Sequence, residues 1–179
     1  MAKNVRLQLN QITRANASAR AVVAKAVQDQ GRDEVQFLAA RFEGEKYFDR
    51  AGGSRTLGRN TKRWNERKAS LGLDPRRGHA SGALQASFND AGAFKPTPYG
   101  FIFDLSLTSR VSKVGKRTQP TSVYLPHYSR QKAGGAIGRF GTPQRNRMKS
   151  KGVSALRQHY VKHGVRSAGG KLKFKVLYG

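Results

Sequence analysis

The sequence predicts an α+β fold: a long N-terminal helix, a small antiparallel sheet with flanking short helices, and extended basic loops. Apolar residues follow helical spacing through the first forty-odd positions, whereas apolar and polar residues alternate from Tyr99 to Leu107. Clusters of Gly and Pro separate these segments. At 179 residues the chain has the usual size of one domain, so we expect residues 1–179 to form a single domain with a modest core.

Residues 1–49 form the predicted N-terminal helical region. Their polar side carries both signs of charge, which is typical of a solvated helix face. Gly31 lies inside the pattern and is expected to kink or divide the helix. The residues with helical spacing are Leu9, Ile12, Ala19, Val23, Ala26, Val27, Phe37, Leu38 and Phe42.

Residues 50–98 are expected to hold a basic loop and short helices. A helix is predicted over Thr61–Leu71, ending at Gly72. Ser81 is placed to cap a further short helix, in which Leu84 and Phe88 share a face because they are four residues apart. We expect that face to be buried.

Residues 99–127 are expected to supply the antiparallel strands. The alternation from Tyr99 to Leu107 predicts a strand with its aromatic and leucine side chains on one face. Thr108–Val114 is expected to return as its hairpin partner, and Thr121–Leu125 to add a third strand.

Residues 128–179 are predicted to form a basic loop, a helix and a terminal strand. Lys132–Gly141 is rich in glycine and predicts a loop, which the basic stretch Arg145–Lys151 follows. A helix is expected over about Ser150–Gly164, with Val153, Leu156 and Tyr160 facing inward. The last strand, Lys171–Tyr178, alternates lysines with apolar residues.

Positive charge is the strongest chemical signal in the sequence. Thirty-five Lys and Arg against ten Asp and Glu give a formal net charge of +25, and from Tyr128 onward there are thirteen basic residues and no acidic one. Such charge favours a polyanion or an acidic partner, although a basic run can also be a solvated face. The candidate contacts are Arg139, Arg145, Arg147, Lys149, Lys151, Arg157, Lys162, Lys171, Lys173 and Lys175.

The three terminal lysines have a second interpretation. Alternate side chains on a strand lie about 7 Å apart, which is comparable to the spacing of phosphates along a nucleic acid. The same lysines could instead protect an edge strand from aggregation.

The sequence offers few residues that could form a catalytic or metal-binding site. There is no cysteine, no phosphate-binding Gly-Lys-Ser/Thr segment and no Gly-x-Ser-x-Gly turn. A triad built on Asp104 and His127 would require an unsupported coincidence, and a metal site on His159 and His163 lacks a third ligand. We therefore expect a protein that is not an enzyme and needs no cofactor or metal.

The N-terminus and the hydropathy pattern predict a product of the cytoplasm. No apolar run approaches the ~20 residues of a membrane span, and no signal-like apolar segment begins the chain. No membrane partner is expected.

Four short segments resemble the phage virion-morphogenesis, or tail-completion, family. Members typically carry a tryptophan with a nearby lysine, which Trp64 and Lys68 match. They also carry a Thr-Gly-x-Leu-x-x-Ser element ahead of a small antiparallel sheet. Here Ser81 replaces the threonine and is followed by Gly82, Leu84 and Ser87. Family members often carry an aromatic-His-Gly segment, which Tyr124–Tyr128 matches without the glycine after His127. They also carry Pro-x-Arg, which Pro143-Gln144-Arg145 matches.

The resemblance implies a structural virion protein of a tailed phage: a tail-completion or neck subunit that joins head and tail. It implies a homo-oligomer, a ring above all, that contacts neck, connector or tail-tube proteins and, through its basic surface, double-stranded DNA or acidic neighbours. The location implied is the virion, after assembly in the host cytoplasm. The same motif residues have a structural reading, in which Trp64 and Leu84 pin two short helices to the sheet.

The alternative is a free nucleic-acid-binding protein, for RNA or for nonspecific DNA. Pro98–Ile102 is similar to the aromatic strand of the RNA-recognition motif, in which rings two residues apart stack on bases. The basic residue and first glycine of that motif are missing, and an ordinary core strand explains the same aromatic residues.

Overall fold

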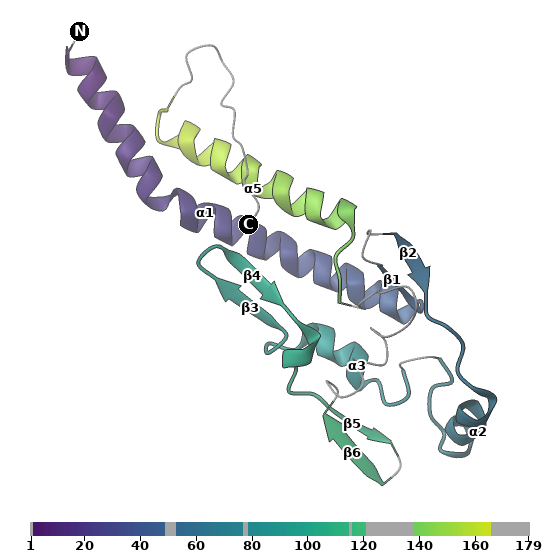
Figure 1. Cartoon of the computed structure of the whole chain (residues 1–179). Helices are drawn as coiled ribbons and strands as arrows, with labels where there is room; N and C mark the ends of the chain where they lie inside the picture. The colour runs from purple at the N-terminus through teal and green to yellow at the C-terminus, as the bar shows by residue number, and fades with distance from the viewer. Residues whose placement is uncertain (1, 49–52, 77–78, 115, 121–137, 166–179) are drawn as a thin grey trace. The chain divides into compact units, whose positions relative to one another are not determined.

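The computed structural model describes residues 2–48, 53–76, 79–114, 116–120 and 138–165, and it confirms the α+β class (Figure 1). The elements in chain order are α1 (Ala2–Glu43), β1 (Lys46–Phe48), β2 (Ser54–Thr56), α2 (Lys62–Ser70), α3 (Ala83–Ala86), η1 (Ser87–Asn89), β3 (Phe94–Thr97), β4 (Gly100–Phe103), η2 (Leu105–Leu107), β5 (Val111–Val114), β6 (Arg117–Pro120) and α5 (Thr142–Lys162).

The chain divides into two compact units. We call Met1–Gly31, Pro96–Phe101 and Arg145–Gly179 the two-helix unit, and Arg32–Lys95 with Ile102–Gln144 the aromatic-core unit. α1 contributes its first part to one unit and its last part to the other. The single domain expected from the sequence stays a prediction.

α1 continues through Gly31 without a break, so the glycine does not divide the helix. The glycine serves close packing instead, because a Cβ built there would lie 2.2 Å from Cε1 of Phe101. In the same unit Gln28 donates to the carbonyls of Thr97 and Gly100, at 2.9 and 2.8 Å. The turn between β3 and β4 is therefore held against α1 by side-chain packing and by two hydrogen bonds.

α5 is longer than predicted and lies beside the middle part of α1, at residues 15–27 (Figure 1). It begins at Thr142, so the stretch Arg145–Lys151, expected to precede the helix, is itself helical. Pro143 stands in the first turn, where the missing N–H costs no intrahelical bond. Gly152 and His159 are the buried residues of its inner face, whereas Val153, Leu156 and Tyr160, predicted to point inward, are half-buried.

The aromatic-core unit buries apolar side chains from the last turns of α1 and from the short elements that follow it. Phe42 and Leu38 are among its most buried side chains, and the core includes Leu84 and Phe88, as the helical spacing predicts. Aromatic rings form a row: Phe42 lies 5.6 Å from Phe88, Phe88 6.1 Å from Phe103, and Phe103 5.8 Å from Phe140. Phe37, expected in the same stripe, is 41% exposed.

The strands are shorter than predicted and pair differently. β4 covers only four residues and pairs with the preceding β3, so Thr108–Val114 is not its partner. Val111–Val114 pairs instead with β6, with Val114 opposite Arg117. A third hairpin, in which Tyr47 lies opposite Arg55, was not expected at all. Alternation identifies a strand but not its neighbour, and Asp104 ends this one by capping η2.

The short helix near residue 84 is present, but Ser81 does not cap it. Gly82 is the N-cap residue, at a φ of 70° in the left-handed region that favours glycine. The hydroxyl of Ser81 lies 2.8 Å from that of Ser112 on β5. The serine therefore connects two elements of the aromatic-core unit rather than satisfying a helix terminus.

Several expectations lie outside the described residues. These are the third strand at Thr121–Leu125, most of the glycine-rich loop, and the terminal strand Lys171–Tyr178.

Replacing Gly31 with Ala tests the close packing of α1. Helix propensity alone predicts that Ala stabilises an interior position by about 1 kcal/mol. The overlap with Phe101 predicts the opposite sign, a net loss of about 1–3 kcal/mol in the free energy of unfolding by denaturant titration. Adding Phe101→Ala to Gly31→Ala should make the glycine substitution harmless; a stabilising Gly31→Ala single variant would contradict the packing.

Candidate functional site: a buried lysine and a cationic helix

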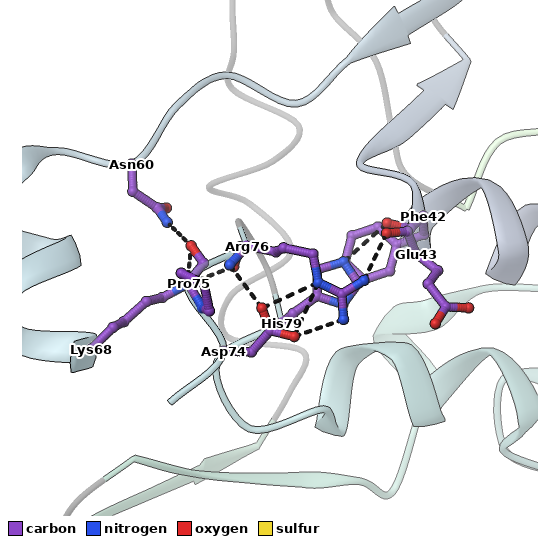
Figure 2. A network of polar contacts seen from close by, with 8 residues as sticks. All are labelled: Phe42, Glu43, Asn60, Lys68, Asp74, Pro75, Arg76 and His79. Carbon is purple, nitrogen blue, oxygen red and sulfur yellow. Dashed lines mark hydrogen bonds and ion pairs between the residues drawn. The ribbon is translucent and has the colours of Figure 1, made fainter. Parts of the chain in front are cut away.

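Lys68 is the most buried cation among the described residues, at 1% exposure. It lies on α2, which begins after Thr61, whose hydroxyl accepts a hydrogen bond from the Trp64 amide. The Lys68 Nζ donates to the carbonyls of Arg76 and Pro75, at 2.5 and 3.3 Å (Figure 2). It also lies 5.8 Å from the centroid of the Trp64 ring. Burial lowers the pKa of Lys68, and the nearby carboxylates of Asp74 and Glu45 partly oppose that shift.

The loop that Lys68 binds is held in a tight turn by Asp74 and Arg76. The Asp74 carboxylate accepts from the backbone N–H of Arg76 at 2.8 Å, and its two oxygens accept from the guanidinium at 2.7 to 3.2 Å. The side-chain hydrogen bond from Arg76 lowers the pKa of Asp74 to about 2. Asn60 adds a hydrogen bond to the Pro75 carbonyl at 2.8 Å.

The same loop caps the C-terminal end of α1. Carbonyls of a last helical turn have no partner within the helix. Arg76 Nη1 donates to the Glu43 carbonyl at 3.1 Å, and His79 Nε2 donates to the Phe42 carbonyl at 3.0 Å, as Figure 2 shows. The His79 ring also stacks on the Phe42 ring, with centroids 4.7 Å apart. Lys68 therefore supports a loop whose side chains close the end of α1.

The other motif residues also occupy packed positions. Leu84 belongs to the core, and Ser87 is fully buried, with its hydroxyl donating to the Ala83 carbonyl at 2.9 Å. Trp64 is half-buried beside Lys68. The motif brings together side chains that shape the protein, and neither Lys68 nor Ser87 is open to a ligand.

The predicted cationic contacts separate by position. Six of them lie on α5 and all six are exposed, whereas Arg139 is half-buried and precedes the helix. Lys171, Lys173 and Lys175 lie outside the described residues. The exposed six are Arg145, Arg147, Lys149, Lys151, Arg157 and Lys162. α5 contains no Asp or Glu, so no carboxylate of the helix itself can pair with them.

His159 anchors α5 to α1. Its Nε2 lies 2.9 Å from the Ala15 carbonyl and 3.1 Å from the Ser18 hydroxyl. A carbonyl only accepts, so this nitrogen carries a hydrogen and donates it to Ala15. The His163 ring is 4.6 Å away, and the described part of the chain contains no group of three or more His, Cys, Asp or Glu that could hold a metal ion.

The aromatic pair proposed for base stacking is divided between two environments. Tyr99 lies in the turn between β3 and β4, is 73% exposed, and has the Arg20 guanidinium 4.8 Å from its ring centroid. Phe101 is half-buried against Gly31. Two rings on one open face, as the RNA-binding alternative requires, are therefore not present here.

The two residues considered for a catalytic triad are not brought together among the described residues. Asp104 accepts from the N–H and the hydroxyl of Ser106, at 2.8 and 2.7 Å, and so caps η2. His127 lies outside the described residues. Within the described ranges, no helix combines the length and the apolar character that a membrane crossing requires.

Comparison of the chain with models of protein families, with curated proteins and with solved structures finds no match.

Replacing Lys68 with Met tests the buried cation. Met keeps an unbranched apolar side chain but leaves the Arg76 carbonyl without its lysine donor, so we expect the free energy of unfolding to fall by about 1–3 kcal/mol. Arg67→Met, on the exposed side of the same helix, is the matched control and should change it by less than about 0.5 kcal/mol. Equal effects of the two variants would show that the carbonyl contacts contribute nothing.

The Asp74 carboxylate should make this loop acid-sensitive. Its pKa is lower in the folded chain than the ordinary value of 3.8, so its stabilising effect is complete above about pH 4 and is lost as the pH falls toward 2. Thermal melts of Asp74→Asn and of the wild type should therefore converge as the pH falls through this window. A difference between them that stays constant from pH 5 to pH 2 would contradict the lowered pKa.

Proposed function

We propose that this chain is a non-enzymatic structural subunit of a tailed-phage neck or tail. It would complete the tail or join it to the head, and assemble with copies of itself and with neck, connector or tail-tube proteins. Its basic surface would meet DNA or acidic neighbours.

The observation that carries this proposal is the excess of basic over acidic residues on α5 and in the segment around it. α5 holds six exposed cations and no carboxylate, within a C-terminal segment that has thirteen basic residues and no acidic one from Tyr128 onward. Because like charges repel, a surface of this kind is more stable beside an anionic partner than alone. A subunit that is completed by its neighbours in an assembly fits that requirement.

The motif residues support the proposal from a second direction. Trp64 and Lys68, together with Leu84 and Ser87, resemble the tail-completion family in type and spacing. All four have defined packing roles in the aromatic-core unit. A motif that specifies a fold is expected in a structural protein, where selection acts on shape rather than on catalysis.

A free nucleic-acid-binding protein is the second candidate, favoured by the exposed ring of Tyr99 beside Arg20. Exposed aromatic rings and arginines are the usual means of binding single strands. A single ring is a small platform, however, and Phe101 packs against α1. We therefore place the structural role first.

Electron microscopy of negatively stained protein tests the proposed role. The full chain, alone or mixed with neck and tail proteins encoded beside it, should form rings or enter larger particles. Assembly that survives 0.5 M salt would exclude an unspecific attraction between exposed charges, which salt screens. A chain that stays a dispersed monomer in every mixture would contradict the proposal.

A further inference from the structure

We infer that the outer face of α5 binds the phosphate backbone of a nucleic-acid duplex, without reading its sequence. This assigns one partner to the basic surface of the proposed function, and it rests on that function for its biological setting. We define the outer face as Ser150, Lys151, Ser154, Arg157, Gln158 and Lys162, all of which are exposed.

Helical periodicity separates this face cleanly from the inner one. At 3.6 residues per turn, the six residues cover one side of α5. The other side contains Gly152, where a Cβ would lie 3.0 Å from Val27 Cγ2, and the buried His159. Tyr160 is half-buried and its hydroxyl donates to the Asn16 side chain. Because α1 occupies the inner side, the outer face is the side on which a partner can lie.

The side chains of the outer face are cations and hydrogen-bond donors, which suits them to bind anions. Lys151, Arg157 and Lys162 supply three cations, and the remaining side chains are two hydroxyls and an amide, which also donate. From Lys151 to Lys162 the helix rises by about 16 Å, a length over which a duplex presents about ten phosphates. Uncharged donors beside cations are the usual set of contacts to phosphate oxygens.

An acidic protein fits this face less well than a nucleic acid. Protein interfaces obtain most of their affinity from aromatic or large apolar side chains that enter pockets of the partner. The apolar side chain on this side of the helix is Val161, which is 67% exposed and small. A surface that attracts by charge and has no large apolar side chains is typical of proteins that bind the phosphate backbone. Counterion release supplies the affinity in that kind of binding.

A single strand also fits less well than a duplex. Proteins that bind single strands stack bases on aromatic rings. No ring lies on the outer face, because Tyr160 turns toward α1. The exposed ring of Tyr99 belongs to the β3–β4 turn and is covered on one side by Arg20. A stiff duplex is therefore the better match to cations that are spread along one side of a rigid helix.

Fluorescence anisotropy with a labelled 20-base-pair duplex of mixed sequence tests the inference on the full chain between 50 and 200 mM salt. The wild type should bind with an affinity that falls steeply with salt. The triple variant Lys151→Gln, Arg157→Gln, Lys162→Gln should reduce the slope of log affinity against log salt by about 3, one unit for each lost phosphate contact. Lys162→Gln alone should reduce it by about 1 and serves if the triple variant is unstable.

The matched control removes the same charge from another exposed surface. Lys62→Gln, Arg63→Gln and Arg67→Gln lie on α2 and change the net charge equally. This variant should keep most of the wild-type salt slope. If it loses as much as the α5 variant, binding follows overall charge and the outer face is not the site.

Other outcomes would also overturn the inference. Tighter binding of a 20-nucleotide single strand, lost in Tyr99→Leu, would assign the binding to the β3–β4 turn. Tighter binding of polyglutamate than of the duplex would assign the face to an acidic protein. Absence of salt-sensitive duplex binding would end the inference while leaving the proposed assembly role to its own test, since microscopy of the α5 variant reports assembly independently of DNA.

Discussion

The rest of the structure depends on how a chain with thirty-five basic and ten acidic residues disposes of its positive charge. Carboxylates are too few to pair with every cation. The one cation that enters the interior among the described residues, Lys68, is satisfied by backbone carbonyls of Pro75 and Arg76. The cations of α5 stay at the surface. Lys68 thus relies on backbone carbonyls, whereas the α5 cations are exposed to solvent and to a partner molecule.

The buried lysine also organises the aromatic-core unit. Lys68 fixes the loop that carries Arg76 and His79, and these two side chains cap the end of α1. The capped turn of α1 contains Phe42, from which the row of aromatic rings continues to Phe88. A lysine in the last turn of a nine-residue helix thereby supports the core at some distance along the chain. The free energy of each step is modest, but the steps share residues and are expected to be cooperative.

Helix-end signals and side-chain spacing predicted the elements whose conformation depends on their own residues. Thr61 and Gly72 mark the ends of α2 in the sequence, and the four-residue spacing of Leu84 and Phe88 identifies a buried face. The failures arose where tertiary contacts decide. The alternation near residue 101 indicated a strand but not its pairing with β3. Gly31 was expected to kink or divide the helix, because the sequence does not show that the Phe101 ring packs against it.

The site shows the same division. The type and spacing of Trp64 and Lys68 singled them out, but the sequence did not show that the lysine is buried. Asp74 and Arg76 lie in the stretch predicted as basic loop and short helices, and nothing in the sequence indicates that the arginine reaches Glu43. His79 carried no signal at all, because its role depends on a helix end that precedes it by more than thirty residues. For α5, the sequence identified the cations, and the helix places three of them, Lys151, Arg157 and Lys162, on its outer face.

The claim at the centre of this account is that the folded chain is completed by an anionic partner. Thermal unfolding of the full chain with increasing duplex DNA measures this directly, because a ligand that binds the folded state stabilises it by about 2.7 kcal/mol at one hundred times its Kd. We expect the melting temperature to rise with DNA at 50 mM salt and to return toward its original value at high salt. A melting temperature that DNA leaves unchanged at both salt concentrations would contradict duplex DNA as that partner.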